Sequence, residues 1–408
     1  MKINKKKKQN FCASAIAAAV FSTPLYAAQL EEVIVTAQKR QEDMQTVPVS
    51  VSAITADQLT DMGFNDIGDI AAQVPSLIVL TNISPLATTF RIRNIGNAGN
   101  IPNFEPATGL FIDGAFRARS GIGIGDLVDV SSVEVLKGPQ STLHGKNVTA
   151  GVISVQTQGP TEQLEAMFEV NLGSDELRQV KSYVSGPLNN WLSGRLSFVD
   201  SRRGELIDNV AGPGADDLNS YAVRGQLRAD FSDALSARLI MGYAEKDMNT
   251  LTGDVFLSEA SQRIVRNAGG SVTIPNDPSD RLIEYADESF YKGDSNDIIL
   301  NISYLGDGYS LTSISSYDDY DGLNFVGDVE QSSLKVADFN DRQRGSSYSQ
   351  EFRIASDGGN DFNWLFGGYY FSNEFIRGDK SLPEFIATED VEAYGDAIVD
   401  ELISRGAL

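Results

Sequence analysis

The chain has 408 residues, of which 56 are acidic and 33 are Lys or Arg, so its formal net charge at pH 7 is −23. Such an acidic excess argues against nucleic-acid binding, which uses basic surfaces. There is one histidine, His144, and one cysteine, Cys12, so an internal disulfide is excluded and any histidine-based catalytic or metal site would have to be built around His144 alone. We therefore predict no enzymatic activity and no cofactor.

Residues 1–28 have the pattern of a secretory signal peptide. Five lysines and no acid flank an apolar core at Phe11–Phe21, and the small residues Ala27 and Ala28 precede Gln29. The core is too short to cross a membrane as a helix. We expect cleavage after Ala27 or Ala28, which exports the protein and removes Cys12.

The segment after the signal predicts a short extended strand on a polar tether. Glu31–Thr36 contains a β-branched run, and polar residues continue to Thr46. An ordinary N-terminal strand would account for this pattern. So would a peptide that adds to the edge of a partner's sheet.

Residues 47–160 predict a small domain of mixed helices and strands. A strand at Val47–Ile54 leads to a capping box, formed by Thr55 and Gln58, which opens a helix that ends at Gly63. Apolar residues at helical spacing from Ile67 to Val74 predict a second helix. Further strands are predicted at Thr88–Arg93, Gly109–Phe116 with a turn at Asp113–Gly114, Ser132–Leu136 and Val152–Gln158.

The loop between the last two of these strands does not fit a phosphate-binding loop. Six residues separate Gly138 from Gly145 where that motif has about four, and Asn147 stands where Ser or Thr would bind magnesium. The segment is better described as a strand, a tight loop and a second strand.

From residue 165 onward the pattern changes to long alternating strands. Tyr221–Phe231 alternates apolar with charged residues over about ten positions, which suits a tilted strand of an outer-membrane barrel with a wet lumen. A soluble sandwich with one solvated face is the alternative. Short turns near 186–190, 232–235, 306–308 and 356–360 alternate with longer connections at 204–218, 248–295, 319–345 and from 372, as in such barrels. A helical stretch is expected from Val391.

Several runs of sequence resemble the signature motifs of TonB-dependent outer-membrane receptors. Glu32–Thr36 matches the TonB box, and SQEFRIAS at 349–356 resembles a recurrent barrel hairpin. The runs that resemble plug-domain motifs are FRIRNIG at 90–96, GLFIDGAFRAR at 109–119 and VEVLKGPQSTLHGKN at 133–147. Asn94 is an insertion relative to the usual pattern, and His144 and Lys146 replace the more usual Tyr and Arg.

The resemblance implies a mixed α+β plug domain followed by antiparallel transmembrane β-barrel strands. About 22 strands enclose a plug in this class of barrel. The sequence predicts about nine of them, so we expect the barrel to be incomplete. The expected divisions are a signal peptide at 1–28, a TonB box and linker at 29–46, a plug at 47–160 and a truncated N-terminal portion of the barrel at 165–408.

The implied function is TonB-dependent active import of a scarce nutrient across the Gram-negative outer membrane, with a ferric siderophore as the leading ligand. The alternatives are a non-iron importer for a carbohydrate, cobalamin or another small molecule, a truncated receptor fragment that does not transport, and a passive porin or adhesin-like barrel. The expected partners are TonB with its inner-membrane energising complex, outer-membrane lipid and a small-molecule ligand such as an iron chelate, with no nucleic acid.

The resemblance also assigns three groups of site residues. The group that binds TonB is Glu31, Glu32, Val33, Ile34, Val35 and Thr36. The candidates for an ionic lock between plug and barrel are Arg93, Glu134, Lys137 and the barrel acid Glu351. The candidates for ligand binding are Asn100, Phe104, Phe116, Arg117 and Arg119. Surface solvation of the charged residues and ordinary loop packing of the aromatic ones are the alternatives.

Overall fold

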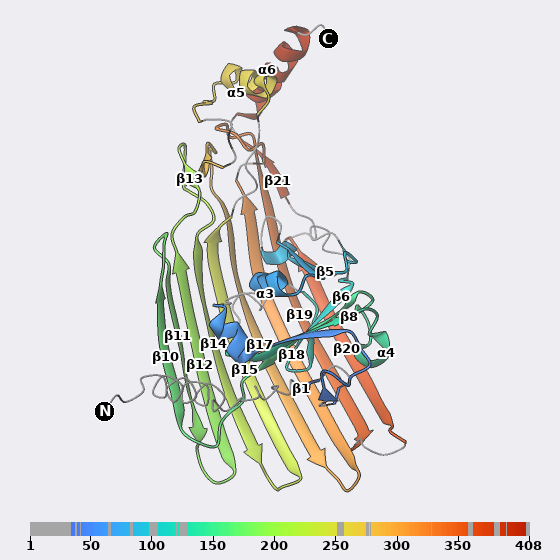
Figure 1. The fold of residues 1–408 in the computed structure, drawn as a ribbon. Coiled ribbons are helices and arrows are strands. Elements are labelled where there is room, and N and C mark those ends of the chain that lie inside the picture. The colour runs from blue at the N-terminus through green and yellow to red at the C-terminus, as the bar shows by residue number, and fades with distance from the viewer. Residues whose placement is uncertain are drawn as a thin grey trace, which may run out of the picture.

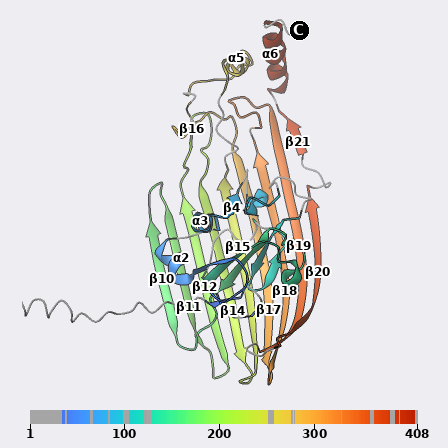
Figure 2. The ribbon, with the colours of Figure 1, turned by 45° about the vertical axis from the view of Figure 1, so that its right-hand side comes forward.

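A computed structural model describes most of the chain from Ile34 to Ser404. The residues within this range that it does not describe are 37–38, 41, 64–66, 82–84, 98–104, 120, 122–128, 251–256, 275–276, 278, 328, 358–361, 379–383 and 389. The predicted signal peptide, Glu31 to Val33, Asn100 and Phe104 therefore lie outside the described residues. A small mixed domain, the plug, lies against one face of a long curved sheet, the barrel sheet (Figure 1, Figure 2).

The plug is built on a five-stranded mixed sheet. Its strands, in spatial order, are β3 (Val51–Thr55), β8 (Val130–Lys137), β9 (Gly151–Thr157), β6 (Thr108–Ile112) and β7 (Ala115–Arg117). Only the β6 and β9 pair is parallel. The other plug elements are β1 (Ile34–Val35), β2 (Glu42–Asp43), α2 (Ala56–Asp61), α3 (Ile67–Gln73), β4 (Leu77–Leu80), η1 (Pro85–Ala87), β5 (Thr89–Ile92) and α4 (Ser141–His144).

Local sequence signals place several of these elements. The capping box predicted at Thr55 and Gln58 is present: the Thr55 side chain accepts from the Gln58 amide, and the Gln58 side chain accepts from the Thr55 amide. The turn between β6 and β7 has φ of 48° at Asp113 and 84° at Gly114, and a two-residue hairpin turn needs positive φ at both positions. Both predictions are confirmed.

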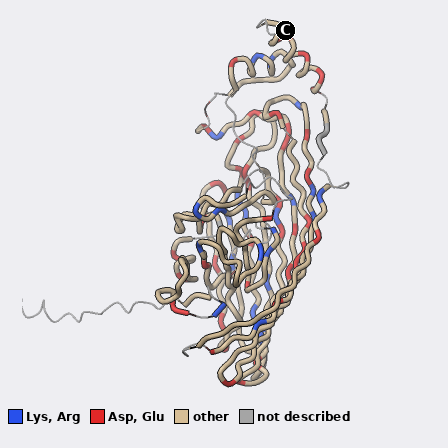
Figure 3. The backbone as a smooth tube through the Cα atoms, turned by 90° about the vertical axis from the view of Figure 1, so that its right-hand side faces the viewer, with Lys and Arg blue, Asp and Glu red and all other residues tan. Residues whose placement is uncertain are grey.

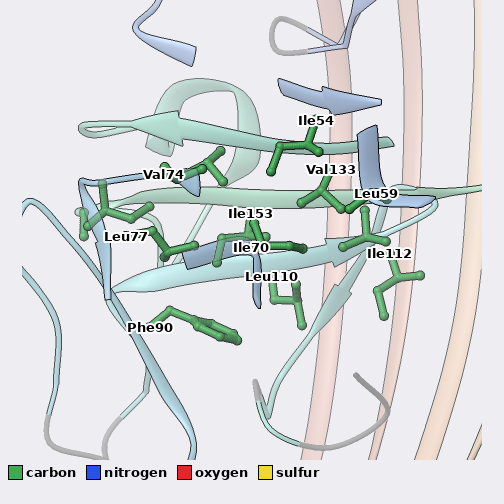
Figure 4. Close-up of a cluster of buried hydrophobic side chains, with 14 residues drawn as sticks. Ile54, Leu59, Ile70, Val74, Leu77, Phe90, Leu110, Ile112, Val133 and Ile153 are labelled. Atoms are coloured by element: carbon green, nitrogen blue, oxygen red, sulfur yellow. The ribbon is translucent and has the colours of Figure 1, made fainter. Parts of the chain in front are cut away.

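Alternation along the plug strands gives the sheet two apolar faces. One face, with helices α2 and α3, forms the main core (Figure 4). Its labelled side chains are Ile54, Leu59, Ile70, Val74, Leu77, Phe90, Leu110, Ile112, Val133 and Ile153. The opposite face forms a second core, which contains Val35, Val47, Phe111, Phe116, Leu136, Val148 and Val152. The N-terminal segment thus reaches the core of the plug through Val35.

Nine antiparallel strands form the main path of the barrel sheet within the described residues, each paired with the next one along that path. They are β10 (Glu165–Leu172), β11 (Arg178–Pro187), β12 (Leu192–Arg203), β14 (Leu218–Asp230), β15 (Leu235–Asn249), β17 (Ser289–Leu305), β18 (Tyr309–Val326), β19 (Ala337–Ser356) and β20 (Leu365–Arg377). The short strand β21 (Glu384–Ala387) pairs with β19. The predicted fold class, including its count of about nine strands, is confirmed.

The burial of side chains in the barrel sheet is inverted relative to a soluble protein. Phe168 and Phe366 are exposed by 73% and 66% on the outer face, whereas Gln179 and Ser197 are buried. An outer-membrane strand shows this arrangement because its apolar side chains face lipid and its polar side chains face the interior. None of the described helices is long and apolar enough to cross a membrane.

Connections at one end of the barrel sheet are short, and most of those at the other are longer, the five residues between β10 and β11 being the exception. The long end carries β13 (Asp208–Asn209), α5 (Glu259–Asn267), β16 (Leu282–Ile283) and α6 (Val391–Ser404). Helix α6 begins at Val391, as predicted. The long connection expected at 319–345 was wrong, because β18 runs to Val326 and β19 starts at Ala337. These strands, of 18 and 20 residues, exceed the roughly ten that cross a bilayer.

Candidate functional site at the plug and barrel interface

The N-terminal segment, by which we mean the described residues 34–36 and 39–40, is docked against the plug. Strand β1 pairs antiparallel with β2, and Ile34 lies opposite Asp43. Val35 is fully buried in the second core, whereas Ile34 is 48% exposed. Three of the six residues expected to bind TonB, Ile34 to Thr36, are therefore located, and they alternate between solvent and plug.

A buried carboxylate fixes the end of this strand. The Thr36 amide donates to both Glu134 carboxylate oxygens, at 2.9 and 3.0 Å, and the Thr36 hydroxyl donates to Oε1 at 3.0 Å. Glu134 is only 2% exposed. Burial raises the pKa of the Glu134 carboxyl, and the bonds from Thr36 act in the opposite direction.

The role expected for Glu134 differs from the one found. Glu134 was expected in an ionic lock, yet within the described part of the chain its carboxylate binds Thr36 and no cation. The physical reason is strand alternation. Glu134 lies two residues from Leu136, on the face of β8 that packs against the N-terminal segment.

A second anchor joins the N-terminal segment to the barrel sheet. Lys39 Nζ lies 2.6 Å from Glu351 Oε2, and Arg353 Nη1 lies 2.8 Å from the other oxygen of the same carboxylate. Arg40 donates to the Trp364 carbonyl at 2.6 Å. Burial lowers the pKa of Lys39 and outweighs the raising effect of Glu351. The segment is thus held by the plug at Thr36 and by the barrel sheet at Lys39 and Arg40.

The barrel acid Glu351 therefore has a different partner from those expected. Arg93 is exposed and its Nη2 lies 3.4 Å from the Ser50 hydroxyl. Lys137 is half-buried. Neither residue forms an ion pair within the described ranges, and Glu351 pairs there with Lys39 and Arg353.

Arg117 was expected to contact ligand, and it instead joins the plug to the barrel sheet. Its Nη2 lies 3.2 Å from Asp297 and its Nη1 lies 3.4 Å from Asp318. These two acids face each other across β17 and β18. Like charges in that position repel, so the buried guanidinium between them compensates both. Burial acts to lower the pKa of Arg117, and the two carboxylates raise it overall.

The other described ligand candidates also make contacts inside the protein. Phe116 is buried and its ring centroid lies 5.4 Å from that of Phe111 and 5.3 Å from that of Phe371. The Arg119 guanidinium lies 4.1 Å from the centroid of Phe375. Asn100 and Phe104 fall outside the described residues, so this group of candidates is not assembled into one site.

Two further polar contacts between plug and barrel sheet were not anticipated from sequence. Asp113 accepts from the Thr157 amide and hydroxyl at 3.0 and 2.8 Å, and Arg238 lies 3.6 Å from it. Asp129 pairs with Arg195 at 2.5 Å. Alternation indicates that Arg195 and Arg238 face inward, but it does not indicate which plug residue each one meets. Charged residues of both signs occur where the plug approaches the sheet (Figure 3).

The contacts of Lys39, Asp113 and Arg238 border a cavity of 490 Å³ between the plug and the short-turn end of the barrel sheet. Its wall includes Thr36, Lys39, His144, Arg238 and Arg353. Burial, together with the charges of Lys39 and Arg353, lowers the pKa of His144 to about 3, so its imidazole is neutral at physiological pH. No group of three or more His, Cys, Asp or Glu side chains suited to a metal ion occurs within the described residues.

Comparison with known proteins gives the family of the plug. The family model "TonB-dependent Receptor Plug Domain" matches residues 43–152. The "Pesticin receptor" of Yersinia pestis is 30% identical over 190 residues, which is 45% of this chain and 27% of that protein. The "Vitamin B12 transporter" of Vibrio vulnificus is 23% identical over 234 residues, 55% of this chain and 38% of that protein.

Solved structures share the fold. The ferric yersiniabactin uptake receptor of Yersinia pestis matches with a TM-score of 0.68 at 22% identity, over 83% of this chain and 50% of that one. The ferripyoverdine receptor of Pseudomonas aeruginosa matches with a TM-score of 0.67 at 17% identity, over 85% of this chain and 45% of that one. This chain spans half or less of each. The family model therefore places residues 43–152 among the plug domains of TonB-dependent receptors, and the plug and the nine consecutive barrel strands of the described residues together have the fold of these two solved receptors.

Proposed function

We propose that this protein takes part in TonB-dependent import of an iron chelate of the siderophore type across the outer membrane. The observation that carries the proposal is the docked N-terminal segment, in which a β-prone strand is held by one buried carboxylate on the plug and one on the barrel sheet. A segment held in this way can detach as a unit and add to the sheet of a partner. Two relatives are named as ferric pyoverdine receptors and another as an iron-regulated outer-membrane protein, which favours an iron chelate.

The proposal includes the location and the division of the chain. A signal peptide at 1–28 directs export, the TonB box and linker occupy 29–46, the plug 47–160 and the barrel portion 165–408. The gap between the end of β9 at Thr157 and the start of β10 at Glu165 supports the last boundary. The exposed apolar face of the barrel sheet supports contact with outer-membrane lipid.

The partner TonB can be tested through the backbone of Ile34. Proline at this position removes an N–H and blocks pairing with a partner strand, whereas valine keeps both the N–H and the β-branched side chain. We expect Ile34→Pro to abolish uptake of radioactive iron from ferric yersiniabactin in energised cells and to leave its binding to the cell surface intact. Ile34→Val should retain uptake.

Equal uptake by the proline and valine variants would contradict import through TonB. A second ligand deserves the same assay, because the relative named as a vitamin B12 transporter matches more of this chain than the pesticin receptor does. If the parent protein takes up cyanocobalamin but no iron, and Ile34→Pro abolishes the uptake of cyanocobalamin, the protein would be assigned to cobalamin import.

A further inference from the structure

The cavity between plug and barrel sheet has a local excess of positive charge. Its volume of 490 Å³ lies within the range of small-molecule sites, about 300–1,000 Å³. Of the described residues in its wall, five are Lys or Arg and one, Asp113, is an acid. The chain as a whole carries a net charge of −23, so this local excess of positive charge is opposite in sign to the charge of the protein.

Some of these cations are already compensated. Arg238 is bound by Thr157 and Gln226 and lies beside Asp113. Arg228 is paired with Asp230. The partly buried guanidinium of Arg238 thus has the partners that burial requires, and the exposed Arg228 is paired as well.

The remaining three cations lack matching negative charge. Lys39 and Arg353 share the single carboxylate of Glu351. Arg40 binds a neutral carbonyl, that of Trp364. Within the described residues, three positive charges therefore meet one negative charge at this wall of the cavity. An anion entering there would gain charge-assisted hydrogen bonds without first displacing an equal number of acids.

His144 adds a polar atom to the same wall. Its Nδ1 is buried. Burial and the neighbouring cations keep the ring neutral. A neutral imidazole can donate one hydrogen bond from the nitrogen that carries the proton, so His144 can contact an anion without adding charge.

We propose that this cavity binds a small anion carrying two or more negative charges, and that binding draws Lys39 away from Glu351 and so weakens the docking of the N-terminal segment. The anion and the Glu351 carboxylate compete for the same two side chains, Lys39 and Arg353. Because Lys39 is also the anchor of the segment, occupancy of the cavity and release of the segment are thermodynamically linked, in both directions. The site lies at the short-turn end of the barrel sheet and does not depend on which ligand is imported.

Binding is tested on the intact purified protein in detergent by calorimetric titration with inorganic pyrophosphate, with chloride used to hold ionic strength constant. Arg353→Gln should weaken binding by about ten-fold or more, since hydrogen bonds between charged groups have strengths of that order. Glu351→Gln should tighten binding, because it removes the competing carboxylate. A purely structural role of Glu351 would give the opposite sign.

Two variants serve as controls. Lys39→Gln should weaken pyrophosphate binding as Arg353→Gln does, and it lies outside the barrel strands, so it replaces Arg353→Gln if that variant does not fold. Arg202→Gln should bind like the parent, because Arg202 is an exposed side chain of β12 that pairs with Asp200 and does not line the cavity.

The link to the N-terminal segment is tested with a nitroxide label at Ile34→Cys, whose thiol is the only one once the predicted signal peptide is removed. Pyrophosphate should increase the mobility of the label, and Glu351→Gln should increase it without pyrophosphate. Equal weakening of binding by Arg202→Gln, or no tightening by Glu351→Gln, would overturn the site. Binding with unchanged label mobility would overturn the link. None of these measurements uses uptake, so their outcome is separate from that of the import assay.

Discussion

At the scale of single residues, the contact between Thr36 and Glu134 sets the docking of the N-terminal segment. The carboxylate gains three hydrogen bonds from Thr36, and it is also removed from water. The hydrogen bonds stabilise the charged form of the carboxyl, and removal from water destabilises it. Burial is the larger, so the docked state holds the proton more tightly than a solvated glutamate does.

This balance predicts a dependence of stability on pH. Because the pKa of Glu134 is raised in the folded protein, its contribution to the free energy of unfolding is fully present below the pKa of the free carboxyl, about 4.3, and is lost as pH rises through the folded-state pKa. The free energy of unfolding, measured by urea titration, should therefore fall with pH in this window. Glu134→Gln should remove this part of the dependence, and an unchanged pH profile in that variant would contradict the assignment to Glu134.

Arg117 provides a second prediction at this scale. Its removal leaves Asp297 and Asp318 facing each other in a partly buried position without this cation. We expect Arg117→Gln to lower the free energy of unfolding by about 3–5 kcal/mol, measured by urea titration in lipid vesicles. Addition of Asp297→Asn and Asp318→Asn should restore most of the loss. Arg119→Gln, which removes a contact with an aromatic ring, should cost clearly less.

At the scale of elements, the β6–β7 hairpin combines a backbone requirement with a contact to the barrel sheet. Gly114 has φ of +84°, and a Cβ there would meet Ile314 Cδ1 of β18 at 2.7 Å. Gly308 has φ of +80° and open space around the position of a Cβ. Alanine at either position would therefore strain the backbone, and alanine at position 114 would also clash with Ile314.

We expect Gly308→Ala to cost about 1–2 kcal/mol of unfolding free energy from the left-handed backbone alone. Gly114→Ala should cost more, since Ile314 must move as well. Urea titrations of the two variants under identical conditions measure the difference. Equal losses would show that Ile314 adapts freely to the plug hairpin.

The elements that local signals define were predictable from sequence. The capping box at Thr55 and the Asp113–Gly114 turn each depend on residues within a few positions of one another, as does the start of α6 at Val391. The upper parts of β18 and β19 were not predicted. These segments are rich in polar residues, so the sequence alone did not mark them as strands. Cross-strand pairs such as Val326 with Phe339 hold them in register, and only the folded sheet brings such pairs together.

The candidate site was less predictable for the same reason. Strand alternation indicates that Glu351 and Arg238 face the plug, but the choice among plug cations depends on three-dimensional distances. Lys39 lies 312 positions from Glu351 in the chain and was not considered as a partner. No residue near Arg117 in the sequence indicates that it pairs with Asp297 and Asp318. The sequence therefore cannot distinguish a ligand-binding role of Arg117 from a structural one.

At the scale of the whole molecule, the N-terminal segment connects the plug and the barrel sheet, which are also joined by buried polar contacts and by apolar contacts such as that of Ala115 with Ile314. Its plug anchor at Thr36 and its barrel anchor at Lys39 are separate, so each should hold the segment in part. Thr36→Ala and Lys39→Gln should each raise the mobility of a label at Ile34→Cys. The double variant should exceed the sum of the two, because one remaining anchor keeps the segment near the other site. Strictly additive effects would show that the anchors act independently.

The facing acids Asp297 and Asp318 also bear on the order of assembly. A β17–β18 hairpin that forms before the plug arrives would present two opposed carboxylates to its interior, and their repulsion would disfavour pairing at that rung. Arrival of Arg117 removes the repulsion. We therefore expect the plug to act as a template on which this hairpin closes during insertion, so that a barrel produced without its plug would insert slowly at neutral pH.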